Sequence, residues 1–285
     1  MANAGTQVKR VLPFTRVAFG AAALLAFIAG VQLYILTDAT DRYFAWTIQQ
    51  PLSAAFLGAG YWTGVLLLFF AIREREWANI RIAVAAVCAF VPLMLLTTLL
   101  HLDRFHFNAA DANPRVAAWA WMVVYLLVPV LLITVLLLQY RAEGTDRPAG
   151  APLPLWLRWL LGVNAGVALL LGVVLFLAPD ALSPRWPWPL TPLTARAIGT
   201  GFLALAIASF AFIRENAWVR GRVGTGSYLL IGALQLIALV RYHDDVRWAL
   251  PGTWLYIAYM AAIFGGGLYS TVAAWHGSLL PQRAR

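Results

Sequence analysis

Eight long apolar segments, separated by short polar stretches, constrain this chain more than any other feature. They lie near residues 13–37, 52–72, 78–101, 115–140, 155–178, 193–213, 219–240 and 252–276. A helix needs about 20 residues to cross a bilayer, and each segment is about that long. A membrane β-barrel would instead show ten-residue segments of alternating polarity, which these are not. The sequence therefore predicts an all-α integral membrane protein with eight transmembrane helices.

The composition agrees with this class of protein. The 285 residues are 62% hydrophobic and 12% charged, whereas a soluble domain carries about 25% charged residues. The net charge of +9 is that of a membrane protein with basic cytoplasmic loops, so nucleic acid is not an expected partner. The single cysteine, Cys88, excludes a disulfide within the chain. Only one of the 21 basic residues is a lysine, which together with heavy alanine and tryptophan usage favours a bacterial inner-membrane protein.

The second constraint is a duplication. The sequence motif I-R-E-x-x-W-x-x-x-R, called the duplicated text below, occurs at residues 72–81 and again at 213–222. Each copy joins two apolar segments. Matching positions lie 141 residues apart, since 213 − 72 = 141, and the segment that begins at Pro51 returns at Pro192 with the same spacing. Because polar positions recur at a constant spacing across several spans, the sequence indicates an internal repeat of four helices.

Four spans return a chain to the side on which it started. The two repeats, residues 1–140 and 155–285, are therefore predicted to be parallel and related by a pseudo-twofold axis along the membrane normal. Residues 141–154 are rich in glycine and proline and are predicted to form a flexible cytoplasmic linker. Fourteen of the 21 basic residues fall on the side of the linker and seven on the other, which predicts that both termini are cytoplasmic.

The duplicated text is predicted to anchor two cytoplasmic hairpins. Arginine suits a helix C-terminus, tryptophan suits the membrane interface, and each glutamate can pair with an arginine of the other repeat. The alternative interpretation is a binding patch for a lipid headgroup or a cytosolic partner, which would make the protein a structural subunit of a complex. The residues concerned are Arg73, Glu74, Trp77, Arg81, Arg214, Glu215, Trp218 and Arg222.

Glycines follow the start of the second span in each repeat. Gly58 and Gly60 correspond to Gly199 and Gly201 at the 141-residue spacing. Glycine allows helices to approach closely, so we expect these positions to form contacts between helices of the two repeats.

The opposite, outer side carries the most chemically versatile residues. His101, Asp103, Arg104 and His106 follow the third span, and their counterparts after the seventh span are Arg241, His243, Asp244 and Arg247. If the repeats face each other, these side chains converge on one outer site for an anionic or amphipathic small molecule or a lipid headgroup. Trp186 and Trp188 are predicted to cover that site.

Two alternatives remain for the outer residues. His101, His106 and His243 are weak candidates for metal ligands, because His101 and His106 lie about 140° apart on a helix and arginines beside them oppose a cation. The other is a membrane enzyme that uses these histidines with Asp103, Asp244 or Asp245. No acidic residue, lysine or histidine lies near a span midplane, which disfavours ion-coupled transport. No cofactor is indicated, and a homo-oligomer stays open.

Overall fold

The computed structural model describes residues 7–150 and 152–275, and within these ranges the protein is all-helical. Among the described residues, eight helices are long and apolar enough to cross a membrane, which confirms the predicted helical class and the number of candidate spans. Every span begins and ends within four residues of the apolar segment that predicted it. Hydropathy therefore located the helices well, because a spanning segment must be apolar along its whole length.

Residues 7–150 and 152–275 form ten α-helices. They are α1 (Pro13–Gly30, continued by a π-helical turn, Val31–Ile35), α2 (Thr40–Tyr43), α3 (Pro51–Arg73), α4 (Arg81–Leu99), α5 (Ala112–Arg141), α6 (Leu155–Leu177), α7 (Pro179–Leu182), α8 (Pro192–Glu215), α9 (Trp218–Arg241) and α10 (Pro251–Trp275). We call α1 to α5 the N-terminal half and α6 to α10 the C-terminal half.

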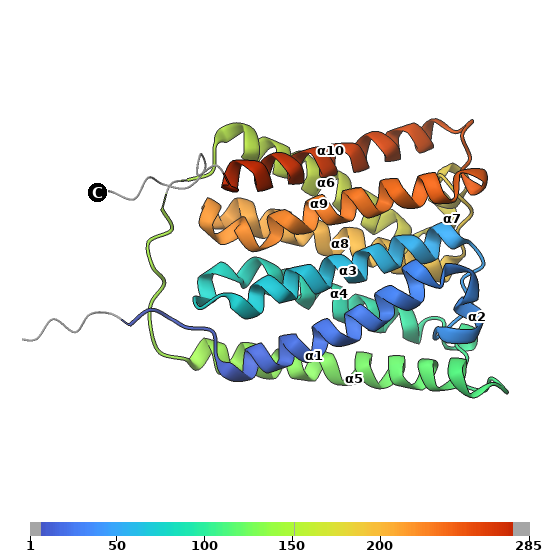
Figure 1. Ribbon diagram of the computed structural model, residues 1–285, viewed down its shortest axis with the longest axis horizontal. Helices are drawn as coiled ribbons and strands as arrows, with labels where there is room; N and C mark the ends of the chain where they lie inside the picture. Colours follow the sequence, from blue (N-terminus) through green and yellow to red (C-terminus); the bar gives the residue numbers. More distant parts are fainter. Residues whose placement is uncertain (1–6, 151, 276–285) are drawn as a thin grey trace, which may run out of the picture.

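Four helices form the middle of the bundle. In Figure 1, α3, α4, α8 and α9 lie between a flank of α1 and α5 and a flank of α6 and α10. Between the halves, α3 packs along α9 and α4 packs along α8, whereas α1 packs on α3 and α6 packs on α8 within each half. The short helices α2 and α7 lie at one end, here called the loop end. The linker lies at the opposite end, here called the linker end.

Proline begins both of the central helices that carry the duplicated glycines. Pro51 starts α3 and Pro192 starts α8, at positions where the missing N–H would have no helical partner. At α8, Thr191 and Thr194 satisfy each other's backbone N–H groups in a capping box. At α3 the corresponding hydroxyl, Ser53 Oγ, instead accepts a hydrogen bond from the indole of Trp188 in the other half, at 2.9 Å.

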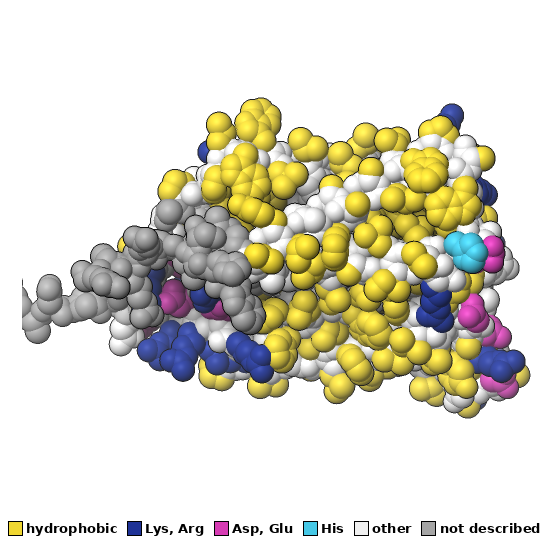
Figure 2. Space-filling model, turned by 45° about the horizontal axis from the view of Figure 1, so that its top comes forward, with side chains coloured by type: hydrophobic (Ala, Val, Ile, Leu, Met, Phe, Trp, Pro, Cys, Tyr) yellow, Lys and Arg dark blue, Asp and Glu magenta, His cyan; other side chains and the backbone are white. Residues whose placement is uncertain are grey.

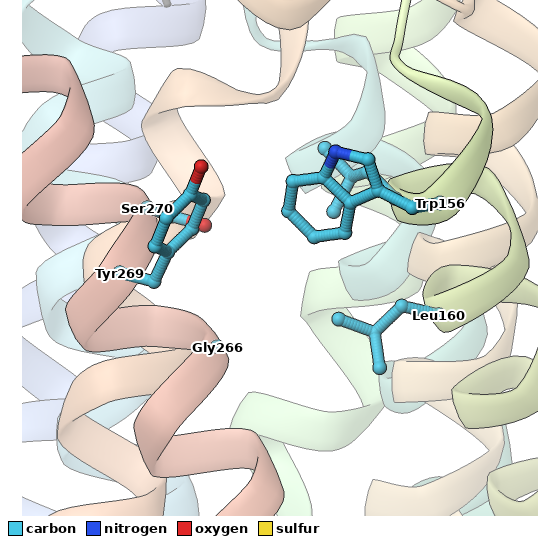
Figure 3. A pocket seen from close by; sticks show the side chains of 6 residues that line it. Trp156, Leu160, Gly266, Tyr269 and Ser270 are labelled. Carbon is cyan, nitrogen blue, oxygen red and sulfur yellow. The ribbon is translucent and has the colours of Figure 1, made fainter. Parts of the chain in front are cut away.

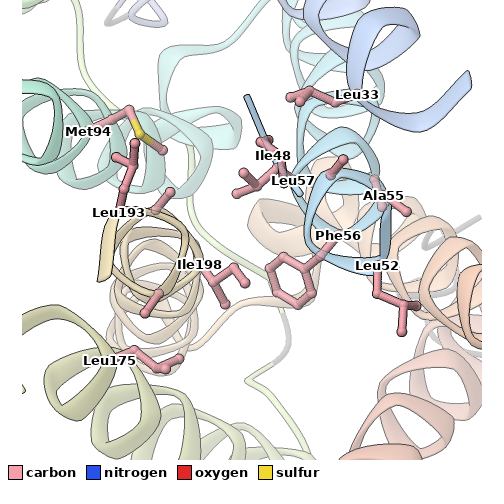
Figure 4. Packing of buried hydrophobic residues seen from close by; sticks show 14 of the residues in the cluster. Leu33, Ile48, Leu52, Ala55, Phe56, Leu57, Met94, Leu175, Leu193 and Ile198 are labelled. Carbon is pink, nitrogen blue, oxygen red and sulfur yellow. The ribbon is translucent and has the colours of Figure 1, made fainter. Parts of the chain in front are cut away.

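The centre of the bundle is filled by side chains. Figure 4 shows Phe56 of α3 and Ile198 of α8 in the space between their helices, and both are buried. The buried amide of Gln235 on α9 donates to the carbonyl of Phe56 at 3.2 Å and accepts from Tyr256 on α10 at 3.0 Å. Packing and buried hydrogen bonds therefore join the two halves at the core.

The glycine contacts differ from the prediction. A Cβ on Gly58 would lie 2.6 Å from the backbone nitrogen of Tyr34, and one on Gly199 would lie 3.0 Å from the carbonyl oxygen of Gly172. These neighbours belong to the same half, so the predicted contact between repeats is wrong for this pair. The glycines let α1 cross α3 and α6 cross α8. Beyond the backbone of its own helix, a Cβ built on Gly60 or Gly201 would meet no described atom within 4 Å.

The linker is more firmly held than its composition predicts. Thr145 exchanges backbone hydrogen bonds with Gln7 and Lys9 of the N-terminal segment, at 2.9 and 3.0 Å. Asp146 forms a salt bridge with Arg81 at 2.8 Å, and Arg147 forms one with Glu76 at 3.1 Å. Ion pairs and backbone pairing thus fix residues 145–147 against both the N-terminal segment and the hairpin between α3 and α4.

An apolar belt surrounds the middle of the molecule. In Figure 2 hydrophobic side chains cover the central zone of the visible face, and charged side chains gather at its two ends. Many of the exposed apolar side chains lie on the outermost helices, among them Leu127, Val130 and Ile133 of α5 and Leu170 of α6. Together with the eight long apolar helices, this surface makes the protein a multi-pass membrane protein in contact with the bilayer.

Candidate functional site

The acidic residues predicted for the outer site lie at the loop end, and each is paired with its own neighbour. Asp103 binds Arg104 at 3.0 Å, and His243 lies 3.2 Å from Asp244. All four side chains are largely exposed. Exposed pairs of this kind contribute about 0–1 kcal/mol to folding, so they do not by themselves form an organised site.

The two remaining arginines of the predicted site hold backbone segments in place. The Arg241 guanidinium donates to the carbonyl of Tyr34 at 2.9 Å, and this contact joins the two halves. Arg247 donates to the carbonyl of Ser183 at 3.1 Å and thereby ties the loop after α9 to the loop after α7. Both arginines therefore stabilise the loops at this end through hydrogen bonds to backbone carbonyls.

The two tryptophans predicted to cover the outer site lie inside the protein. Trp186 and Trp188 are buried and pack edge to face, with ring centroids 5.5 Å apart. Both also contact the ring of Tyr256. The aromatic area that an exposed shelf would leave in water is buried here, and the indole N–H of Trp188 donates to Ser53. They are not available as a cover.

The three histidines at the loop end have separate partners. The Nε2 atom of His101 accepts a hydrogen bond from Arg196 at 2.8 Å, since a guanidinium can only donate. Partial burial and then the Arg196 charge lower the pKa of His101. His106 contacts the carbonyl of Phe44 at 3.0 Å and the hydroxyl of Thr47 at 2.9 Å.

The residues predicted for the outer site thus make separate contacts with different loops. Within residues 7–150 and 152–275, no group of three His, Cys, Asp or Glu side chains is close enough to hold a metal ion. Convergence of both clusters on one ligand stays a prediction.

The duplicated text at the linker end forms crossed ion pairs between the halves. Glu74 accepts from both Nε and Nη2 of Arg222, at 3.0 and 2.7 Å. Reciprocally, Arg81 donates to Glu215 at 3.1 Å. The glutamate of each copy therefore pairs with the last arginine of the other copy, as the sequence allowed.

The surroundings of the two crossed pairs differ. Glu74 receives a further hydrogen bond from the amide of Asn79 at 3.1 Å. In the other pair, Glu215 also binds Arg220, and Arg81 also binds Asp146 of the linker. One crossed pair is therefore nearly self-contained, whereas the other belongs to a network of four charged groups.

The other predicted hairpin anchors have more local positions. Trp218 is buried against Phe212 in the protein interior, although the sequence predicted an interfacial position for it. Trp77 is half-buried, and the exposed Arg73 stacks over the ring of Phe69 at 3.7 Å. Arg214 is exposed at the end of α8.

A lateral groove between α6 and α10 is a hollow that the sequence did not predict. Its volume is about 320 Å³, at the lower end of the range for small-molecule sites. Figure 3 shows Trp156 and Leu160 on one wall facing Tyr269, Ser270 and Gly266 on the other. The available clue in the sequence was the run Gly265-Gly266-Gly267, because a glycine adds no side chain to the wall of a groove.

The groove has an aromatic mouth. The rings of Trp156 and Tyr269 lie 5.5 Å apart, near the linker ends of their helices. Beyond the lining of the groove, the same two helices are joined where Tyr259 of α10 donates to Asn164 of α6 at 2.8 Å. Asn164 in turn donates to Ser209 of α8. The groove itself has apolar walls and carries hydrogen-bonding atoms at its mouth.

Comparison with protein-family models, with curated proteins and with solved structures found no match.

Proposed function

We propose that this protein resides in a bacterial inner membrane as two parallel four-helix repeats, with both termini in the cytoplasm. The crossed pairs support the arrangement, because a pseudo-twofold axis exchanges the Glu74–Arg222 pair with the Glu215–Arg81 pair. The glycine crossings of α1 with α3 and of α6 with α8 are related in the same way. The excess of basic residues at the linker end supports the cytoplasmic assignment of that end. The termini themselves, residues 1–6 and 276–285, lie outside the described residues.

We infer that the protein binds an amphipathic molecule that enters sideways from the bilayer. The groove between α6 and α10 is the observation that carries this proposal. Its walls are apolar, its mouth presents the polar atoms of Trp156, Tyr269 and Ser270, and it lies on helices that contact the bilayer. Such a combination suits a molecule with a hydrocarbon part and a small polar part.

Binding is favoured over transport and over acid–base catalysis. The filled centre around Phe56, Ile198 and Gln235 leaves the halves in close contact where a transporter with parallel repeats would place its pathway. Catalysis by the outer histidines would need convergent acid and base groups, and their separate partners do not favour it. The proposed role is therefore a binding or structural one.

Adjacent glycines of α10 provide a matched test. A Cβ on Gly266 would point toward Leu160, 4.0 Å away across the groove, whereas a Cβ on Gly265 meets no atom within 4 Å. Gly266→Leu should fill the groove, and Gly265→Leu should add the same side chain at a position without close neighbours. The measurement is the thermal unfolding midpoint of detergent-purified protein, with and without added dioleoylphosphatidylglycerol.

A ligand that binds only the folded state raises its stability by about 2.7 kcal/mol at a hundred times the dissociation constant. Wild type and Gly265→Leu should therefore show equal stabilisation by the lipid, and Gly266→Leu should lose most of it. Equal stabilisation of all three proteins would rule out the groove as the binding site.

A further inference from the structure

We propose, on the basis of the binding function above, that the ligand is a membrane lipid held by one acyl chain and its ester group. We further infer that it comes from the cytoplasmic leaflet and that the site is indifferent to the charge of its headgroup. These properties follow from the place, the length and the chemistry of the groove.

The groove is continuous with the surface that contacts the bilayer. Trp156, Leu160 and Tyr269 line it, and they remain 49%, 43% and 52% exposed. In a membrane this exposed area faces hydrocarbon rather than water, so a lipid chain can enter without crossing an aqueous barrier. Lipid is also the amphipathic species present at the highest local concentration beside such a surface.

The length of the groove fits one leaflet. Its lining on α6 runs from Trp156 to Leu160, four residues or about 6 Å at 1.5 Å per residue, and its lining on α10 runs from Gly266 to Ser270. Half of the hydrocarbon core is about 15 Å thick. A chain that lies in the groove beside Trp156 therefore stays within the leaflet on the linker side.

The polar atoms at the mouth are all uncharged. They are the indole N–H of Trp156 and the hydroxyls of Tyr269 and Ser270, which can donate hydrogen bonds to an ester carbonyl. The nearest cation along α6, Arg158, lies two residues from Trp156 and so about 200° around the helix. The described lining therefore offers hydrogen bonds to the glycerol region of a lipid and no ionic contact to its headgroup.

Lipids that share their chains and differ in their headgroups test this inference. Dioleoylphosphatidylglycerol, dioleoylphosphatidylethanolamine, dioleoylphosphatidylcholine and dioleoylglycerol would be titrated into wild type, Gly265→Leu and Gly266→Leu. Native mass spectrometry of the protein in detergent would give the dissociation constant of each. We expect the four constants of wild type to agree within about threefold, and Gly266→Leu to weaken all four by at least tenfold.

The possible results separate the two proposals. A preference of fivefold or more for the anionic lipid, about what one exposed ion pair contributes (~1 kcal/mol), would overturn headgroup indifference while leaving the groove as the site. Equal binding of every lipid to wild type and to Gly266→Leu would overturn the site itself. Leu160→Trp fills the groove from the opposite wall, so it gives the same readout if Gly266→Leu does not fold.

Discussion

The two crossed ion pairs should respond differently to exchange of their charges. Exchanging the first pair, in Glu74→Arg with Arg222→Glu, leaves an arginine and a glutamate facing each other between the halves, with Asn79 able to accept from the new arginine. Exchanging the second pair, in Arg81→Glu with Glu215→Arg, places the new glutamate beside Asp146 and the new arginine beside Arg220. The first exchange should restore stability, and the second should not.

The structure sets the magnitude of these effects. Glu74 is 15% exposed, so a single reversal at either partner leaves a mostly buried charge against a like charge. Removing one member of a fully buried pair costs about 3–5 kcal/mol. Since Arg222 is 45% exposed and reaches solvent, we expect about 2 kcal/mol for each single reversal. The first double reversal should recover to within about 1 kcal/mol of wild type, and the second should cost at least as much as its worse single reversal.

The assay is the free energy of unfolding in mixed detergent micelles, followed by loss of helix on addition of sodium dodecyl sulfate. Each pair requires wild type, two single variants and the double variant, which together form a thermodynamic cycle. Recovery of both double variants to the same degree would refute the assignment of Asp146 and Arg220 to the second pair. Single reversals at Glu74 and Arg222 without any cost would refute a stabilising role for the first.

Three further predictions concern other parts of the fold. Gly58→Ala should lower the free energy of unfolding by about 1–3 kcal/mol, because its Cβ would meet backbone at 2.6 Å, whereas Gly60→Ala, at a position without close neighbours, should be neutral or slightly stabilising in the same assay. Folding lowers the pKa of His101, so below about pH 6.5 the unfolded chain binds a proton more readily than the folded protein does. Acid therefore favours unfolding, and the midpoint of unfolding should decrease as the pH is lowered from 7 to 5. His101→Asn should flatten that slope, and an unchanged slope would exclude this histidine as its source. Gln139→Ala should increase hydrogen exchange at residues 10–12. The buried Gln139 amide donates to the carbonyl of Arg10 at 2.8 Å and accepts from the N–H of Leu12 at 3.1 Å, and the substitution removes both hydrogen bonds. Unchanged exchange would contradict a role of Gln139 in holding this segment.

Several features of the site were within reach of the sequence, and others were not. The reciprocal bond between Glu74 and Arg222 was foreseen as a possibility, because opposite charges recur at a constant spacing in both halves. The burial of Trp188 was not foreseen. A proline-rich segment with two tryptophans suits a membrane interface as well as an interior, and only the position of Ser53 on a neighbouring helix decides between them. The groove was also beyond the sequence, since it depends on the separation of two helices that are far apart in the chain.

The sequence by itself determined which segments are helices and that eight of them are long and apolar enough to cross a membrane. These properties are local: the cost of placing a polar residue or an unpaired peptide group in hydrocarbon depends only on the segment that carries it. The tertiary structure decided that Gly58 and Gly199 contact helices of their own half, that Asp146 joins the charges around Arg81, and that α6 and α10 leave a groove. Those outcomes depend on the rotation of each helix about its axis and on the paths of the loops, and hydropathy constrains neither.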